Sequence, residues 1–322
     1  MSDVVRHFTV QVPATSANLG PGFDAFGLAL DLYLAVRTVP RSVQAERIVT
    51  DGDGCAELAT GDGNLVWRSF VAFCEDRDVA VPDLAMRASS TIPLERGLGS
   101  SSAAIVAGLV LARAATGVVI GDRDLVALAS RIEGHPDNVA PALLGGLVAC
   151  AADDDGGVVV RRVNPAAALR PLVLVPLTRQ ATSQARSVLP ATLPREQVTD
   201  QAARAGHVLA ALTGTWPVAV GVAGDRLHEP VRFAAMQPTG EVVEQLRSAG
   251  IHAWLSGAGP SVAAAVPAAD RAVVDRVRSI AATHAFTLHE LAFELSGAFA
   301  CPDDGCALAG SGGCVQCPRR RV

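Results

Sequence analysis

The stretch from Pro93 to Ala104 reads PLERGLGSSSAA and decides how the surrounding chain folds. A strand pattern, Leu84–Ile92, precedes it, and a helical pattern, Ser100–Thr116, begins inside it. Glycine lets the backbone approach an anion closely and adopt positive φ. The serines can cap the helix or offer hydroxyl groups, and the N-terminus of a helix favours negative charge. An ordinary helix start is the alternative, but other segments favour a phosphate-binding loop.

The basic residues are all arginine. The sequence contains no lysine among its 27 basic residues. This excludes a P-loop lysine, the strand lysine of a protein kinase and a Schiff-base lysine. Phosphate must therefore be held by arginine, backbone amides, hydroxyls or a metal ion.

The composition indicates a folded chain. Of the 322 residues, 50% are hydrophobic and 18% charged, with a net charge of −5, so neither disorder nor a nucleic-acid partner is expected. The N-terminus has no apolar signal core, and the longest apolar run, Ser102–Ala112, is shorter than the ~20 residues that span a bilayer. We therefore expect a cytoplasmic protein without a membrane partner.

Both halves of the chain alternate between strand and helix patterns, which indicates layered α/β or α+β packing. In the first half we expect strands at Phe8–Val12, Leu32–Val39, Leu84–Ile92 and Val158–Val163, and helices at Ser100–Thr116 and Asp122–Ile132, with Asp122 as N-cap. In the second half we expect strands at Leu172–Leu177, Ala253–Leu255, Val262–Val266 and Phe286–Leu295, and helices at Glu196–Leu212, Glu241–Ala249 and Asp270–Ala282.

Two further segments carry turn residues and polar groups. Ser256–Ser261 reads SGAGPS and lies between two strand patterns, as a hairpin turn would. Pro13–Asp24 reads PATSANLGPGFD and follows the first strand. Within it, Asn18 offers a donor and an acceptor, and Asp24 a negative charge. Either segment alone would be taken for an ordinary loop.

The last stretch, from Cys301 to Val322, is rich in glycine and cysteine and is expected to be an appended tail. Cys301, Cys306, Cys314 and Cys317 include a Cys-x-x-Cys pair, which is a common zinc half-site. The wide spacing of the first pair favours a disordered tail over structural zinc.

Together the three loop segments, in this order, resemble the signature of the GHMP small-molecule kinases. The middle one is similar to that family's phosphate-binding loop. Pro13–Gly27 (PATSANLGPGFDAFG) and Glu133–Gly146 (EGHPDNVAPALLGG) resemble the substrate-side motifs of its homoserine kinases. The resemblance extends from about Val10 to Leu295.

The resemblance implies transfer of the γ-phosphate of ATP to the side-chain hydroxyl of L-homoserine. The product, O-phospho-L-homoserine, would serve threonine synthesis. The implied fold is α+β, with an N-terminal domain like ribosomal protein S5 (residues 1–165) and a ferredoxin-like C-terminal domain (residues 166–300), followed by the tail (residues 301–322). The active site would lie between the domains, and a homodimer is expected.

The resemblance also implies residue roles on the nucleotide side. Asn64 is expected near the adenine, and Glu133 with Ser101 is expected to bind Mg²⁺ through oxygen. A solvated helix-end carboxylate is the alternative for Glu133. The residues expected to hold the triphosphate form one run: Pro93, Leu94, Glu95, Arg96, Gly97, Leu98, Gly99, Ser100, Ser101, Ser102 and Ala103.

On the substrate side, the α-ammonium is expected to face Asp24, and the α-carboxylate to meet Arg186 and Arg232. The expected pocket around the hydroxyl consists of Asn18, His135, Asn138 and Thr182. Asn138 and Glu133 are the expected catalytic pair. Asp137 is interpreted as a structural or supporting residue, because phosphoryl transfer with a loose transition state depends mainly on alignment and charge neutralisation.

Two other functions remain open. A kinase for another small alcohol, such as mevalonate or a sugar, would have no use for Asp24, because such substrates carry no ammonium group. A nucleotide-binding protein without activity would bind ATP but release no ADP with homoserine.

Overall fold

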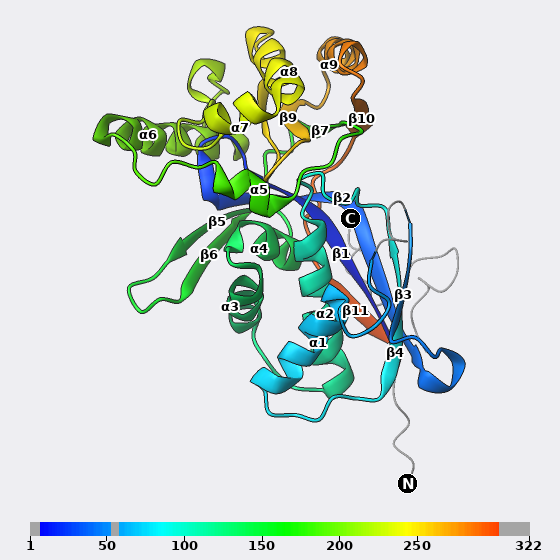
Figure 1. Ribbon diagram of the computed structural model, residues 1–322. Helices are drawn as coiled ribbons and strands as arrows, with labels where there is room; N and C mark the ends of the chain where they lie inside the picture. Colours follow the sequence, from blue (N-terminus) through cyan, green and yellow to red (C-terminus); the bar gives the residue numbers. More distant parts are fainter. Residues whose placement is uncertain (1–6, 53–57, 303–322) are drawn as a thin grey trace.

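The computed structural model describes residues 7–52 and 58–302, which form two β-sheets with helices packed against each (Figure 1). This confirms the expectation of two mixed halves. The change of sheet comes near residue 165, where the sequence pattern also changes.

The first sheet has seven strands, and its central path runs β11-β1-β2-β4-β3. The long strand β2 pairs with β1 along its length, with β4 through its C-terminal part and with β5 through Phe26–Leu28. All pairings are antiparallel except β3 with β4. The strands are β1 (Phe8–Asn18), β2 (Gly22–Pro40), β3 (Ile48–Asp51), β4 (Leu84–Ser90), β5 (Leu147–Ala152), β6 (Val158–Val163) and β11 (Phe299–Pro302).

Four helices accompany this sheet, and α2 and α4 contact β1 and β2 directly (Figure 1). The helix α2 is buried on nearly every side, as its composition of alanine, valine, leucine and isoleucine predicts. The helices are α1 (Leu65–Asp76), α2 (Ser100–Thr116), α3 (Asp122–Glu133) and α4 (Pro136–Leu144), with a short 3-10 turn η1 (Arg41–Val43).

The second sheet has four antiparallel strands in the order β10-β7-β9-β8. Helices α8 and α9 pack on it and share an apolar core with β7 and β9. The strands are β7 (Leu169–Val175), β8 (His252–Leu255), β9 (Val262–Pro267) and β10 (Thr287–Glu290). The helical elements are α5 (Thr182–Ser187), α6 (Arg195–Leu212), η3 (Val220–Val222), α7 (Glu229–Ala235), α8 (Gln237–Ser248) and α9 (Arg271–Thr283).

The two sheets share part of their core. Trp254 of β8 is fully buried within the larger apolar cluster around the first sheet. Its indole N–H donates to the hydroxyl of Ser16 on β1 at 3.0 Å. The chain also returns to the first sheet through β11, which pairs with β1. The end of β1 and the β8–β9 turn are therefore held in one fixed arrangement.

Several expected boundaries were wrong. The segment Pro13–Asp24 is not one long loop, because β1 continues to Asn18 and β2 begins at Gly22. The N-cap of α3 is Gly121, and Asp122 is the first helical residue. The strand expected at Phe286–Leu295 is limited to β10.

The tail also begins later than expected. Cys301 is a buried residue of β11, so it belongs to the first sheet and not to an appended segment. Cys306, Cys314 and Cys317, the other members of the proposed zinc set, lie outside the described residues. Among the helices of the described part, none combines the length and apolar character needed to cross a bilayer.

The packing of α1 on α2 depends on Gly108. A Cβ atom at this position would lie 2.3 Å from the carbonyl oxygen of Val66. We predict that Gly108→Ala lowers the free energy of unfolding by about 1–3 kcal/mol, because a backbone group must move.

Gly206→Ala is the matched control, since Gly206 is also helical but has no neighbouring atom within 4 Å of a Cβ. It should raise stability by up to about 1 kcal/mol, through helix propensity alone. Urea denaturation of both variants checks the pair, and equal effects would contradict the described packing.

Candidate functional site

A polar cavity of about 250 Å³ opens at the N-terminus of α2. Side chains from both halves of the chain line it, and they carry charges of both signs. It contains most of the residues singled out in the sequence: Asn18, Asp24, Glu95, Gly97, Gly99, Ser100, Ser101, Ser102, Glu133, His135, Asp137, Asn138, Arg186 and Arg232.

A second cavity of about 290 Å³ adjoins the first and shares Glu95, Ser100 and Ser101 with it. Its lining is mostly apolar and includes Leu34, Leu58, Leu65, Val66, Ala88, Ile92, Leu94 and Ala104. The start of α2 therefore lies between an apolar cavity and a polar, charged one. A flat aromatic group fits the first environment, and a small zwitterion fits the second.

The segment expected to bind phosphate forms a glycine-rich turn that leads into α2. Gly99 is the N-cap, in the left-handed region at φ 68°. The expectation that serines cap this helix was wrong: within the described part of the chain, no side chain caps α2. Its first N–H groups thus remain available to an anion.

Steric limits around the loop require glycine at two positions. At Gly99, a Cβ would lie 1.9 Å from Oγ1 of Thr15. At Gly97, a Cβ would lie 2.1 Å from the carbonyl oxygen of Ser256, in the second glycine-rich turn. The hydroxyl of Ser256 donates to the carbonyl of Gly97 at 2.7 Å. The two glycine-rich turns are therefore in direct backbone contact.

Other side chains of the run face away from the cavities. Leu98 and Ala103 are buried in the apolar core. Arg96 donates to the carbonyl oxygens of Leu94, Pro176 and Leu177, so its guanidinium joins the loop to the end of the second sheet. Pro93 is half-buried and lines neither cavity. These residues shape the loop, and its backbone faces the site.

Glu133 ends α3 beside the start of α2. Its Oε1 accepts hydrogen bonds from the hydroxyls of Ser101 at 2.7 Å and Ser102 at 2.8 Å. A carboxylate and two hydroxyls form a set of hard oxygen donors, which suits Mg²⁺ better than a softer metal. The structure thus brings the two expected metal ligands together.

Asn64 lines the apolar cavity, but its side chain caps α1. Its Oδ1 accepts from the amide of Val66 at 2.9 Å, and its Nδ2 donates to the carbonyl of Ala59 at 2.8 Å. The amide is therefore fixed by its own neighbourhood before any ligand binds.

Asp24 and Arg186 form a two-point ion pair. The guanidinium donates to the carboxylate at 2.7 and 3.1 Å. Burial disfavours the charged form of Arg186, but the hydrogen bond and charge of Asp24 outweigh it and raise the arginine pKa. Both side chains remain about one-third exposed, at 34% and 37%, so a ligand can reach the pair.

Arg232 is buried deeper, at 2% exposure. Its Nε donates to the carbonyl of Ala185 and its Nη1 to the carbonyl of Gly257, both at 3.1 Å. Desolvation lowers the pKa of Arg232, but an arginine still keeps its charge. The ring of Phe23 lies 5.4 Å below this guanidinium and 5.7 Å from that of Arg186.

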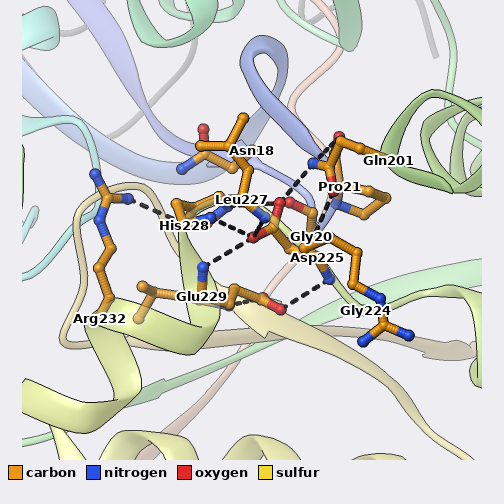
Figure 2. Close-up of polar contacts among 12 residues, drawn as sticks. Asn18, Gly20, Pro21, Gln201, Gly224, Asp225, Leu227, His228, Glu229 and Arg232 are labelled. Carbon is orange, nitrogen blue, oxygen red and sulfur yellow. Dashed lines mark hydrogen bonds and ion pairs between the residues drawn. The ribbon is translucent and has the colours of Figure 1, made fainter. Parts of the chain in front are cut away.

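Asn18 ends β1 with positive φ, and its side chain joins three segments. Its Oδ1 accepts from the amide of Asp24 at 3.1 Å, and its Nδ2 donates to the carbonyl of Gly257 at 3.0 Å. Figure 2 shows Asn18 beside the Gly20–Pro21 turn, with Arg232 approaching from α7. Thr182 is the first residue of α5, next to Ala181 of the polar cavity.

Asn138 lies at the start of α4 and is almost fully buried. Its Oδ1 accepts from the hydroxyl of Thr15 at 2.7 Å. Because the amide oxygen is engaged, the group that Asn138 offers to a ligand is its NH₂ donor.

His135 and Asp137 form a partly buried pair in which Nδ1 of His135 is hydrogen-bonded to the carboxylate. Burial lowers the pKa of His135, but the bond to Asp137 and its charge more than offset this, so the pKa is raised overall. Polar atoms of Asp24, His135 and Asp137 lie within 4.8 Å of one another. This corner of the cavity favours a cationic group.

Sequence reasoning missed several lining residues. Phe23 forms part of the quoted N-terminal motif, but its role under two guanidiniums depends on the tertiary fold. Gln180 and Ala181 precede α5 and carry no local signal. Gly257 and Ala258 belong to the second glycine-rich turn, whose sequence did signal a special turn.

Comparisons with known proteins find two matching family models and many similar sequences. Residues 64–146 match the family model of the GHMP kinases N terminal domain, and residues 198–283 match that of the GHMP kinases C terminal. A homoserine kinase of Clavibacter michiganensis is 42% identical over 80% of this chain and 82% of its own. A homoserine kinase of Streptomyces coelicolor is 39% identical over 91% of this chain and 94% of its own.

Solved structures show the same fold. The structure of a putative homoserine kinase from Listeria monocytogenes has a TM-score of 0.71 and 29% identity, covering 92% of this chain and 100% of that one. A homoserine kinase from Cytophaga hutchinsonii has a TM-score of 0.78 and 24% identity, covering 94% of this chain and 99% of that one.

The two glycines that flank α2 provide a matched test of the loop. Both adopt positive φ, 68° at Gly99 and 69° at Gly117, but only Gly99 has close neighbours. We predict that both alanine variants lose about 1 kcal/mol of stability from left-handed strain, and that Gly99→Ala loses a further ~1–3 kcal/mol because Thr15 must move away from its Cβ. Only Gly99→Ala should also weaken binding of a nucleoside triphosphate by tenfold or more, on the order of 1.4 kcal/mol.

Titration with a fluorescent ATP analogue checks this difference, with thermal melting as the control for folding. Equal affinities of the two variants would show that the loop does not hold the nucleotide.

Proposed function

The chain belongs to the GHMP kinases, and we propose that it transfers the γ-phosphate of ATP to the side-chain hydroxyl of L-homoserine. The products are O-phospho-L-homoserine and ADP. The reaction places this kinase in threonine biosynthesis.

The observation that carries this proposal is the pairing of opposite charges at one end of the polar cavity. Asp24 offers a carboxylate to an ammonium group, while Arg186 and Arg232 offer guanidiniums to a carboxylate. The open N-terminus of α2 lies at the other end of the same cavity. An α-amino acid with a side-chain hydroxyl matches both ends.

In this proposal the adenosine of ATP lies in the apolar cavity, and Asn64 holds the start of α1 beside it. The triphosphate extends along the loop Pro93–Ala103 to the N–H groups of Ser100–Ser102. The helix dipole and these N–H groups provide the positive potential that a lysine provides in other kinases.

Glu133 and Ser101 are the proposed ligands of a Mg²⁺ ion, with Ser102 alongside. When bound, Mg²⁺ would neutralise charge on the phosphate oxygens and fix their positions. Both serine hydroxyls already donate to the Glu133 carboxylate. A cation bound among these oxygens would take the place of the two hydroxyl protons as the partner of the carboxylate.

L-homoserine binds by exchange of ion pairs. Its ammonium group replaces the guanidinium of Arg186 at Asp24, and its carboxylate meets Arg186 and Arg232. Since Asp24 and Arg186 neutralise each other in the free protein, the zwitterion preserves the charge balance of the cavity. His135 and Asn18 close the pocket, and Thr182 is proposed to lie beside the substrate.

Asn138 is proposed to orient the reacting hydroxyl. Thr15 fixes the amide oxygen, so the NH₂ group donates to the substrate oxygen and leaves its lone pair directed at the phosphate. That oxygen bonds to the γ-phosphorus, the bond to the bridging oxygen breaks, and ADP leaves with the bonding electrons. As the new bond forms, the hydroxyl proton passes to an oxygen of the transferred phosphate and from there to water.

We propose that no side chain removes this proton in advance. Asp137 is buried, with 2% of its surface exposed, and is hydrogen-bonded to His135, which suits a supporting role. A loose transition state places little charge on the attacking oxygen, so late release of the proton is tolerated.

A homodimer also stays a prediction, and light scattering would check it.

The substrate assignment predicts that ADP release depends on L-homoserine and is not supported by mevalonate or galactose. Asp24→Asn should raise the KM for homoserine about 10–100-fold, because a charge-assisted hydrogen bond is worth roughly 1.5–3 kcal/mol. The KM for ATP should stay within about twofold, as the nucleotide lies at the other end of the loop. A coupled ADP assay measures both constants.

Asp155→Asn is the control, because Asp155 is an exposed residue of the β5–β6 turn and lines neither cavity. It should leave both constants unchanged. Turnover of mevalonate or galactose in place of homoserine would transfer the assignment to another alcohol. Tight ATP binding with no ADP release would remove the kinase assignment altogether.

The metal assignment predicts that Glu133→Gln raises the Mg²⁺ concentration for half-maximal activity by about tenfold or more, because a charged ligand is lost. Glu196→Gln, at an exposed position in the first turn of α6, should have no such effect. Activity measured against Mg²⁺ at saturating ATP checks both. An unchanged Mg²⁺ dependence would remove Glu133 from the metal site.

A further inference from the structure

A buried imidazole links the two ends of the proposed amino-acid site. His228 immediately precedes α7 and has 0% exposure. Its Nδ1 lies 3.2 Å from Nη1 of Arg232, and its Nε2 lies 3.1 Å from the carbonyl oxygen of Gly20 (Figure 2). Arg232 binds one end of the substrate, and Gly20 belongs to the turn between Asn18 and Asp24 at the other end.

These two contacts determine the tautomer of His228. A guanidinium N–H can only donate, so Nδ1 must accept and carries no proton. A carbonyl oxygen can only accept, so Nε2 must carry the proton and donate it. The imidazole is therefore neutral, with its single proton on Nε2.

The charges around the ring agree with a neutral form. Burial lowers the pKa of His228, and Arg232 lowers it further, whereas Asp225 and Glu229 act in the opposite direction. Both carboxylates have other partners. Oδ2 of Asp225 accepts hydrogen bonds from the backbone N–H groups of residues 227–229 at 2.5–2.8 Å. The carboxylate of Glu229 forms an ion pair with Arg247 at 2.8 Å.

The same network fixes the position of the ring. Asp225 holds the start of α7 through those backbone bonds, and the carboxylate of Glu229 accepts a hydrogen bond from the amide N–H of Asp225 at 3.1 Å. Gln201 of α6 donates to Oδ1 of Asp225 at 2.5 Å and to the carbonyl of Pro21 at 2.7 Å (Figure 2). The α7 start and the Gly20–Pro21 turn are thus joined at two points, His228 and Gln201.

The contacts of Arg232 show what the imidazole accomplishes. The Nε–H goes to Ala185, and the two hydrogens of Nη1 go to Gly257 and His228. Among the described residues, Nη2 has no hydrogen-bond acceptor. Fixing Nε and Nη1 determines the plane of the guanidinium, so the two N–H groups of Nη2 are the ones left for a ligand.

We propose that His228 is a positioning residue for substrate recognition: its unprotonated Nδ1 holds Arg232 so that Nη2 meets the α-carboxylate, and its Nε2–H anchors this arm to the turn carrying Asn18 and Asp24. The proposal rests on the proposed function, because it takes Arg232 as the carboxylate ligand. It adds a residue that touches neither substrate nor phosphate and yet sets the spacing between the two charged ends.

The two amide residues separate the roles of the two ring nitrogens. The oxygen of asparagine can stand in for Nδ1 as the acceptor for Arg232, whereas the amide nitrogen of glutamine can stand in for Nε2 as the donor to Gly20. We expect His228→Gln to raise the KM for L-homoserine about tenfold, with kcat and the KM for ATP within about twofold. His228→Asn should stay within about threefold of the parent KM.

A substrate without the carboxylate provides the internal control. In 2-amino-1,4-butanediol a hydroxymethyl group replaces the carboxylate, so Arg232 has no anion to bind. The parent enzyme should use this diol poorly, and His228→Gln should lower its use no further. An equal loss on the diol and on homoserine would overturn the proposal, as would equal KM values for the Gln and Asn variants.

A measurement independent of catalysis separates this proposal from the proposed function. In ¹⁵N spectra of the full chain labelled at histidine, the His228 signals should show a protonated Nε2 and an unprotonated Nδ1, with assignment by loss of the signals in His228→Asn. A proton on Nδ1, or a charged ring, would overturn the positioning role even in an active kinase. The expected tautomer without homoserine turnover would instead overturn the proposed function alone.

Discussion

The contact on which the site depends is the backbone approach of two glycine-rich turns. Gly97 lies so close to the Ser256–Gly259 turn that a Cβ would collide with the Ser256 carbonyl at 2.1 Å. The hydroxyl of Ser256 donates its single proton to the Gly97 carbonyl, and its oxygen lies 2.8 Å from the hydroxyl of Ser16 on β1, from which it accepts. One serine thereby ties the phosphate loop, the first strand and the second sheet into a single unit.

The proposed binding of a triphosphate by a chain without lysine depends on this contact. The loop keeps its backbone N–H groups exposed because glycines remove the side chains that would fill the space, and because the nearby serine hydroxyls bond to Glu133 instead of capping α2. The turn that supports the loop also supplies the Gly257 carbonyl to Asn18 and Arg232. The proposed phosphate site and the proposed amino-acid site therefore share one rigid framework.

Much of this arrangement could be predicted from the sequence, since the fold elements follow from local patterns. The helical pattern predicted α2 at its observed bounds, and the structure places Gly99 and Gly117, both at positive φ, at its two ends. The length of β2 and the return of β11 to the first sheet could not be predicted, because both depend on pairing between residues far apart in the chain.

Phe23 and His228 were missed for the same reason: their contacts with Arg232 exist only once α7 packs against the β1–β2 turn. The ion pair of Asp24 with Arg186 was also unforeseen, since each was assigned to the substrate alone.

The proposed reaction depends on where the phosphates lie relative to the amino acid. A crystal structure of the protein with L-homoserine, Mg²⁺ and a non-hydrolysable ATP analogue tests it most directly. Our account predicts the β- and γ-phosphates against the backbone N–H groups at the start of α2, with the substrate hydroxyl beside the γ-phosphorus and the carboxylate on Arg232. Phosphates bound to arginine side chains away from α2, or an amino acid bound outside the polar cavity, would contradict it.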